Sequence, residues 1–203
     1  MTDKQNLLIE LYNLKLFGYK YINKSKIIKS NINTLPNNIE ELNSRINNCN
    51  LCELSHRVKS KTTHKNSLNN KIVVIVPYIL NEKQNKILQD LLYKYLNINI
   101  DDVLVLNLIK CDINNLIVNE ECFVKCKEFT IKQLEIVNPK FIFSFGDIYK
   151  LIVEDILKIG EKINYNNSYL YYLDELEYIL RNPSSIDRYT NTFRKIKNEM
   201  EKI

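Results

Sequence analysis

Five cysteines are the residues of this 203-residue chain whose type and spacing could do chemistry. Cys49 and Cys52 form a C-x-x-C pair, and Cys111, Cys122 and Cys126 lie far along the chain. Four thiolates suit tetrahedral zinc or an iron–sulfur cluster. A zinc ribbon normally brings two C-x-x-C pairs, and this chain has one, so the scattered second pair favours the iron–sulfur cluster. The alternative is that the last three cysteines are small buried hydrophobic residues.

Composition limits the setting in which these thiols act. Hydrophobic residues make up 45% of the chain, which is enough for a packed core. The N-terminus lacks the basic patch and apolar run of a signal peptide, and no apolar run has the length of a membrane span. We therefore expect a cytoplasmic, monomeric protein with no membrane partner, in which structural disulfides are uncommon. The net charge of +5 is compatible with DNA as a partner but does not require it.

The hydrophobic pattern predicts strands that alternate with helices. Continuous β-branched runs, typical of strands buried on both faces, occupy residues 71–76, 102–109 and 140–145. Further apolar patterns predict helices at 83–96, 119–137 and 147–158, a hairpin or a last strand with an insertion at 168–180, and a closing basic helix from residue 184. Alternation of this kind predicts an α/β fold with a parallel sheet covered on both sides.

Two parts of the chain are distinguished by composition. Residues 1–36 are predicted to form an N-terminal extension, in which an amphipathic helix precedes a lysine-rich linker. Residues 37–203 are predicted to form the main domain. Its first helix is expected to begin at Asn37 or Asn38, either of which could cap it, and to bring the chain to Cys49.

The order of the cysteine-bearing pieces resembles the iron–sulfur branch, family 4, of the uracil-DNA glycosylase superfamily. The pieces are C-x-x-C-x-L-x-x-R at 49–57, LNLIKC at 106–111, and the stretch 126–146, in which a proline follows the cysteine by thirteen residues. The resemblance covers about residues 38–203. It implies a three-layer α/β/α sandwich with a short central parallel sheet.

The same resemblance implies a cofactor and its ligands. The cofactor is a 4Fe–4S cluster, with zinc as the alternative, and the ligands are Cys49, Cys52, Cys111 and Cys126. Cys122 lies one helical turn before Cys126 and is a possible substitute ligand.

Two asparagines match the family's active-site positions. Asn107 corresponds to the asparagine at the end of the second strand, which reads the base, although an amide satisfied by nearby backbone is the alternative. Asn182, in the stretch RNPSSIDR, stands where the family usually has the histidine of H-P-S, which serves the leaving base, and Ser184 completes this motif as a substrate-binding residue. An ordinary turn is the alternative for this stretch.

The family's first motif, G-E-A-P-G, is missing. The strand continues instead into VPYILNEKQ, where Tyr78 could stack on a base in place of the family's phenylalanine. Glu82 is the nearest carboxylate, but its register is wrong, and Asp112 is a weaker candidate near the crevice. The residue that positions water is therefore unassigned.

These observations predict a uracil-DNA glycosylase-like DNA repair protein that hydrolyses the N-glycosidic bond of a flipped uracil or other damaged base. Whether it is an active enzyme is open, because the first motif is lost. The alternatives are a catalytically inactive iron–sulfur module that binds DNA or a protein, and a zinc-stapled α/β domain of unrelated function. Basic residues expected to contact phosphate are Arg57, Lys59, Lys61, Arg188 and Arg194.

Overall fold

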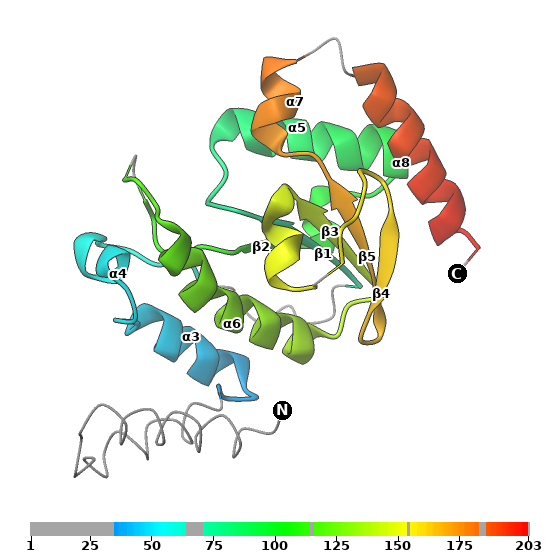
Figure 1. Cartoon of the computed structure of the whole chain (residues 1–203). Helices are drawn as coiled ribbons and strands as arrows, with labels where there is room; N and C mark the ends of the chain where they lie inside the picture. The colour runs from blue at the N-terminus through cyan, green and yellow to red at the C-terminus, as the bar shows by residue number, and fades with distance from the viewer. Residues whose placement is uncertain (1–34, 64–70, 114–115, 154, 183–185, 203) are drawn as a thin grey trace, which may run out of the picture. The chain divides into compact units, whose positions relative to one another are not determined.

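The structure is a computed structural model that describes residues 35–63, 71–113, 116–153, 155–182 and 186–202. The predicted extension at 1–36 lies almost wholly outside the described residues. The described part of the chain has an α/β fold built on one five-stranded sheet (Figure 1).

The central sheet has the strand order β2-β1-β3-β5-β4. The first four strands in this order run parallel, and β4 pairs antiparallel with β5 at one edge. The strand bounds are β1 (Ile72–Val76), β2 (Val103–Asn107), β3 (Phe141–Phe145), β4 (Lys162–Tyr165) and β5 (Ser168–Leu173). The three strands predicted from continuous apolar runs are confirmed within one or two residues at each end.

Helices lie on both faces of the sheet, an arrangement compatible with a three-layer sandwich (Figure 1). One face is covered by α5, η1 and α8, and the other by α6 and η3, with α3 packed on α6. The bounds are α3 (Ile39–Asn47), α4 (Glu53–Arg57), α5 (Glu82–Leu91), the π-helical η1 (Leu92–Leu96), the 3₁₀ turns η2 (Ile100–Asp102) and η3 (Asp147–Leu151), α6 (Glu120–Val137), α7 (Leu176–Arg181) and α8 (Ile186–Met200).

Side-chain caps fix where three of these helices begin. Asn38 accepts hydrogen bonds from the backbone N–H groups of Glu40 and Glu41, and Asn119 accepts one from Cys122. The sequence offered Asn37 or Asn38 as the cap of the first of these helices, and the structure uses Asn38. Asn81 and Gln84 form a reciprocal capping box at the start of α5.

One predicted element is wrong, and another is confirmed only in part. The helix expected at 147–158 is only the short 3₁₀ turn η3, because the segment after it leaves helical geometry at residue 153. Residues 168–173 form a strand as one alternative proposed, but they pair with the unforeseen strand β4, and residues 176–181 are the helix α7. A short apolar run such as EYIL fits a helix or a strand equally, and its burial decides between them.

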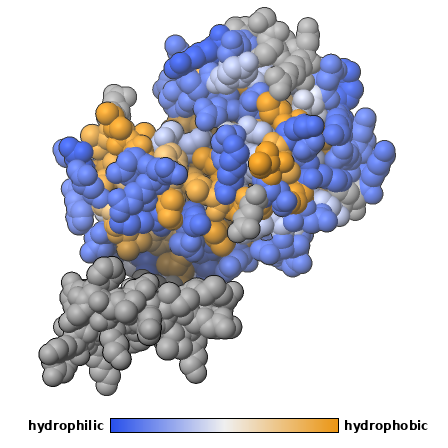
Figure 2. Space-filling view, viewed as in Figure 1, coloured by the Kyte–Doolittle hydropathy of each residue, from blue (hydrophilic) through white to orange (hydrophobic). Residues whose placement is uncertain are grey.

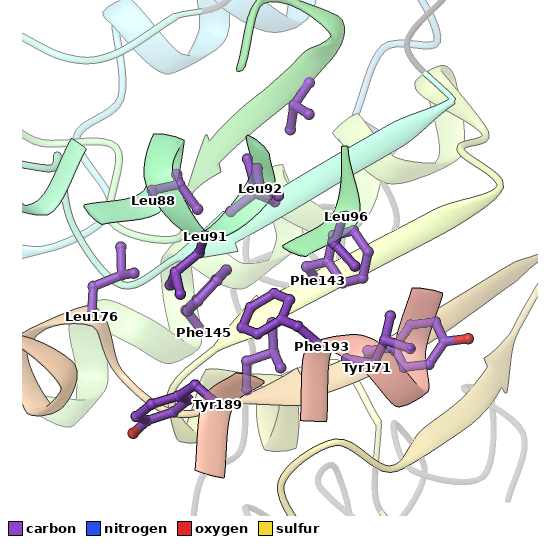
Figure 3. Packing of buried hydrophobic residues seen from close by; sticks show 14 of the residues in the cluster. Leu88, Leu91, Leu92, Leu96, Phe143, Phe145, Tyr171, Leu176, Tyr189 and Phe193 are labelled. Atoms are coloured by element: carbon purple, nitrogen blue, oxygen red, sulfur yellow. The ribbon is translucent and has the colours of Figure 1, made fainter. Parts of the chain in front are cut away.

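The largest apolar cluster lies between the sheet and α5, η1 and α8; we call it the aromatic layer. Figure 3 shows the rings of Phe143, Phe145 and Phe193 directed into it. Phe193 is fully buried and stacks on Tyr95 with ring centroids 5.9 Å apart. This layer fixes α5 and α8 on the sheet.

Three exposed asparagines adopt left-handed backbone conformations. Their φ angles are 59° at Asn97, 46° at Asn138 and 51° at Asn166. Asparagine tolerates this region better than other residues that carry a side chain. The chain has only three glycines, so asparagine ends two helices and turns the β4–β5 hairpin in their place.

Candidate metal centre and neighbouring cavity

Three separate segments bring the cysteines together at the carboxyl end of β2. Cys52 is the N-cap residue of α4, Cys111 follows β2, and Cys122 and Cys126 lie on α6. An isolated antiparallel bridge joins Lys61 to Cys111. On either side of it, the Thr62 N–H donates to the Lys110 carbonyl at 2.6 Å and the Asp112 N–H donates to the Ser60 carbonyl at 3.1 Å.

Lys61 ties the C-x-x-C segment to this bridge. Its ammonium group donates to the carbonyl oxygens of Cys49 at 2.8 Å and Asn47 at 3.1 Å. The sequence assigned Lys61 to phosphate, but the structure uses its ammonium group to hold the end of α3 and the first cysteine.

Four of the cysteines share one buried apolar cluster, which we call the cysteine cluster. It consists of Cys52, Leu54, Ile109, Cys111, Cys122 and Cys126. All five cysteines of the chain are free thiols. The gathering agrees with the prediction that the second pair of cysteines approaches the C-x-x-C pair, and it agrees equally with the alternative that the thiols are buried hydrophobic residues.

Burial and mutual proximity raise the pKa values of three of the thiols, those of Cys111, Cys122 and Cys126. Burial, reinforced by Cys126 and Cys52, raises the pKa of Cys111 to about 12. Burial also raises the pKa of Cys126, to which Cys52 and Cys49 add. The pKa of Cys122 is raised by burial and by a hydrogen bond with Cys52. Binding of a metal centre here would therefore release protons, because only thiolates are ligands.

The donor set suits a thiolate-ligated centre in chemistry and in burial. Among the described residues, however, no three or more His, Cys, Asp or Glu side chains are grouped so that they could hold a metal ion. Ligation would thus require the cysteine side chains to turn toward a shared centre.

A buried lysine lies beside the cysteine cluster. Lys110 is 2% exposed, and its amine donates to the Asn107 carbonyl oxygen and, at 2.6 Å, to Oε1 of Gln133. Burial lowers the pKa of Lys110 to about 7, and the nearby Cys126 opposes this effect. Its backbone N–H also bonds Cys126, which lowers the pKa of that thiol. Lys110 thus connects the end of β2 to α6.

The surface over this region is apolar rather than basic. Figure 2 shows hydrophobic side chains gathered where Figure 1 places α4 and the loop before α6. Leu51, Ile117 and Val124 are the exposed large apolar residues there. Lys59 is exposed, and Arg57 is exposed but pairs with Glu53 at 3.4 Å.

A cavity of about 280 Å³ opens at the carboxyl ends of β1 and β3; we call it the strand-end cavity. Ligand crevices of parallel sheets lie at this edge. Its walls are mostly apolar, and its polar lining residues are Tyr78, Gln84, Glu175 and Glu177. Such a mixture is typical of small-molecule sites, where a few polar groups fix the orientation of the ligand.

Tyr78 connects the strand-end cavity to the cysteine cluster. It lines the cavity and also packs against the cysteine cluster, where its ring meets the edge of Phe123 with centroids 5.6 Å apart. Burial raises the pKa of Tyr78, and the carboxylate of Glu175 raises it further. The residue that the sequence proposed for base stacking therefore stands in the wall of a cavity.

Asn107 lies at the same edge of the sheet. It is 5% exposed and pairs in register with Val76, a residue that lines the cavity. Residues paired in a parallel sheet direct their side chains to the same face. Asn107 therefore adjoins the cavity, although it is not among the residues that line it.

The other predicted site residues lie elsewhere. Asn182 is the C-cap residue of α7, and its side-chain amide donates to the Tyr178 carbonyl at 2.9 Å. Glu82 is exposed in the first turn of α5, and Asp112 accepts a hydrogen bond from Ser60 at 3.3 Å. Ser184 and the side chain of Arg188 lie outside the described residues.

Sequence reasoning missed three polar residues of this region. Glu175 and Gln84 face the cavity from the start of α7 and from α5, and Lys110 lies just after β2, beside the cysteine cluster. Gly146 is the one signal that pointed toward them, since a glycine directly after a strand often allows close approach of another group.

Comparisons with known proteins add no assignment. No protein-family model matches the chain, and no curated protein matches it significantly. Among the described helices, none combines the length and apolar character needed to cross a membrane.

Proposed function

We propose that this protein is a uracil-DNA glycosylase-like DNA repair protein, which receives an extruded damaged base in the strand-end cavity. One observation carries the proposal: Tyr78 stands between this cavity and the cysteine cluster, at the edge of the sheet where parallel folds bind ligands. The sequence resemblance expects a base pocket and a thiolate-rich centre, and this region offers a cavity and gathered thiols side by side.

Tyr78 would stack on the extruded base, since base–aromatic stacking contributes about 1–3 kcal/mol. The ring is well placed for this role because its contact with Phe123 limits its rotation. Asn107, next to Val76 on the same sheet face, would read an edge of the base. The amine of Lys110 holds the carbonyl of Asn107 and thereby fixes the end of β2.

Cleavage of the glycosidic bond places negative charge on the leaving base and positive charge on the sugar. The apolar walls of the cavity, including Val76, Phe145 and Leu176, would keep water from the base and strengthen every polar contact to it. Asn182 could donate one neutral hydrogen bond only after its amide leaves the Tyr178 carbonyl.

Cys49, Cys52, Cys111 and Cys126 would hold a 4Fe–4S cluster, and zinc is the alternative. The centre would supply a cross-link between the end of α3, the end of β2 and α6. Support comes from the gathering itself: Cys52, Cys111 and Cys126 share the cysteine cluster, and Lys61, paired with Cys111, holds the carbonyl oxygen of Cys49. An anaerobic preparation should be brown and absorb at the violet–blue edge, whereas a colourless protein with bound zinc would favour the alternative.

The activity is tested with single- and double-stranded oligonucleotides that carry uracil, hypoxanthine, xanthine or an oxidised guanine. The expected result is abasic sites that become strand breaks on alkaline treatment. Tyr78→Ala should reduce the yield at least tenfold, while Tyr93→Ala, at an exposed site, serves as the matched control. Absence of abasic sites at excess protein would end the enzymatic proposal.

A second candidate is a catalytically inactive module that binds DNA or a protein. The specific observation in its favour is that none of the described cavity-lining residues is a histidine, and the amide of Asn182 already bonds the α7 backbone. If DNA is the partner, affinity should fall steeply with salt as phosphate contacts are lost. Failure to bind any DNA at low salt would leave a protein partner.

A further inference from the structure

Two carboxylates line the strand-end cavity, and their bonding differs. Glu177 accepts a hydrogen bond from Gln84 at 3.2 Å and an ion pair from the Arg181 guanidinium at 2.9 Å. The carboxylate of Glu175 has no hydrogen-bond donor and no ion-pair partner among the described residues. Glu175 is an exposed residue of the cavity lining, so its acceptor oxygens are open to solvent and to a ligand that enters the cavity.

Gly146 holds the stem of Glu175 in place. This glycine follows β3 with φ +84°, and a Cβ atom there would lie 2.7 Å from Cγ and 3.1 Å from Oε1 of Glu175. The side chain of Glu175 thus packs against the backbone of Gly146, in space that a Cβ atom would occupy.

Tyr78 and Glu175 line the same cavity. The carboxylate is close enough to the phenol to contribute to the raised pKa of Tyr78, after the larger effect of burial. Because both residues line the same cavity, a flat ring stacked on Tyr78 can present an edge to Glu175. At about 280 Å³, the cavity has room for a ring system.

We infer that the strand-end cavity selects a guanine-type purine, whose ring N–H and exocyclic amine donate side by side to the carboxylate of Glu175. A carboxylate can only accept hydrogen bonds, and two parallel donors match its two oxygens. Uracil offers one N–H between two carbonyl oxygens, which the carboxylate would repel. This inference rests on the proposed function in that it takes the cavity to be the base site, and it narrows the substrate to a lesion that keeps the guanine edge.

Binding of nucleosides to the full chain tests the inference without any cleavage step. Isothermal titration with guanosine, inosine and uridine should rank affinity in that order, because inosine lacks the exocyclic amine. We expect guanosine to bind at least tenfold more tightly than inosine, and uridine to bind most weakly. Arginine amide, whose flat guanidinium also has paired donors, is the control for charge attraction to Glu175 and Glu177. It should bind at least tenfold more weakly than guanosine.

Glu175→Gln provides the sharpest test. A glutamine amide accepts from one N–H and donates to one carbonyl; this matches uridine, inosine and the carbonyl side of guanosine, but it gives up the paired, charge-assisted bonds to the ring N–H and the exocyclic amine. The variant should therefore lose at least tenfold in guanosine affinity and gain affinity for uridine. Glu177→Gln removes the same charge from a lining carboxylate already bonded to Gln84 and Arg181, and it should weaken guanosine binding less than Glu175→Gln does.

A pair of glycine variants separates the position of Glu175 from general stability. Gly146→Ala should displace Glu175 and weaken guanosine binding at least fivefold. Gly160→Ala has a similar conflict, with φ +79° and a contact of 2.6 Å to Cγ2 of Thr192, but it lies outside the cavity lining and should leave guanosine affinity unchanged.

The outcomes distinguish failure of this inference from failure of the proposed function. The choice of guanine is overturned if uridine binds as tightly as guanosine or more tightly, or if arginine amide binds as tightly as guanosine. Neither result bears on glycosylase activity, which the oligonucleotide assay tests. The inference is supported if Glu175→Gln weakens guanosine binding and strengthens uridine binding, even if no oligonucleotide is cleaved. Failure of all three nucleosides to bind at millimolar concentration overturns it as well.

Discussion

The aromatic layer and the cysteine cluster are stabilised by different physics. The aromatic layer is closed by large apolar side chains such as Phe143, Phe145 and Phe193, all fully buried. The cysteine cluster contains small thiols and lies against the buried amine of Lys110. Apolar burial contributes about 25 cal/mol per Å² and needs no partner, whereas buried polar groups must be paired to avoid a penalty.

This difference separates a part of the molecule stabilised by apolar packing from a part to which the proposed metal centre would add stability. The aromatic layer positions α5 and α8 and one wall of the strand-end cavity. The cysteine cluster holds the short helix α4, which at five residues is too short to be stable alone. The stability of α4 would therefore respond more strongly to a ligand on the thiols than the stability of α5 or α8 would.

The largest expected effect on the free energy of unfolding comes from a substitution in the aromatic layer. Phe193→Ala removes a fully buried ring stacked on Tyr95 and should lower the free energy of unfolding by about 3–5 kcal/mol. Urea denaturation measures the change, with the exposed Tyr93→Ala as control. The loss should be the same with and without iron, and a loss below about 1 kcal/mol would contradict the comparison.

The next effect tests the cysteine cluster when it is loaded. Cys111→Ser should abolish the iron–sulfur absorbance and lower the free energy of unfolding of the iron-loaded protein by about 3 kcal/mol, through loss of ligand binding to the folded state. Cys122→Ser, at a buried thiol on the same helix as Cys126, should keep the absorbance. If Cys122→Ser bleaches the protein and Cys126→Ser does not, the ligand assignment is wrong.

Lys110 offers an intermediate effect. Lys110→Met leaves the Asn107 carbonyl and Oε1 of Gln133 without their buried donor and should cost about 1–3 kcal/mol. Adding Gln133→Leu removes one orphaned acceptor and also the Nε2 atom that already lacks a partner. The double variant should recover part of the loss in chemical denaturation, and a strictly additive result would show that the two side chains are not coupled.

The smallest effect concerns α4 itself. Glu53→Gln breaks an ion pair with Arg57 in which both side chains are mostly exposed, at 73% and 60%. The free energy of unfolding should change by less than about 0.5 kcal/mol. Leu54→Ala, at a side chain only 4% exposed, is the contrasting variant and should cost about 2–5 kcal/mol if burial rather than the surface charge holds this helix.

Much of the fold could be predicted because its signals are local. The runs KIVVIV and KFIFSF are β-branched or aromatic throughout, so their strands follow from the residues alone, and Asn38 and Asn119 mark helix starts by their own side chains. The segment after Gly146 has helical spacing but ends as a short turn, since tertiary packing overrides propensity.

The candidate site could be predicted only in part. The approach of Cys111 to the C-x-x-C segment follows from spacing and from the resemblance, and Tyr78 lies where the sequence placed it, directly after β1. Glu175 could not be found this way, because it meets Tyr78 across nearly a hundred residues through the path of β5 into α7. The tertiary role of Lys61 is equally non-local, since its ammonium bonds carbonyls twelve and fourteen residues earlier.

The left-handed asparagines have a practical consequence. Asn97, Asn138 and Asn166 are exposed, and their strain arises from a Cβ atom that glycine lacks. Glycine at these three turns would relieve the backbone without disturbing a packed ring or a thiol. Such a triple variant would have a higher free energy of unfolding. The destabilising substitutions proposed for the cysteine cluster and the cavity can then be made in it without unfolding the protein.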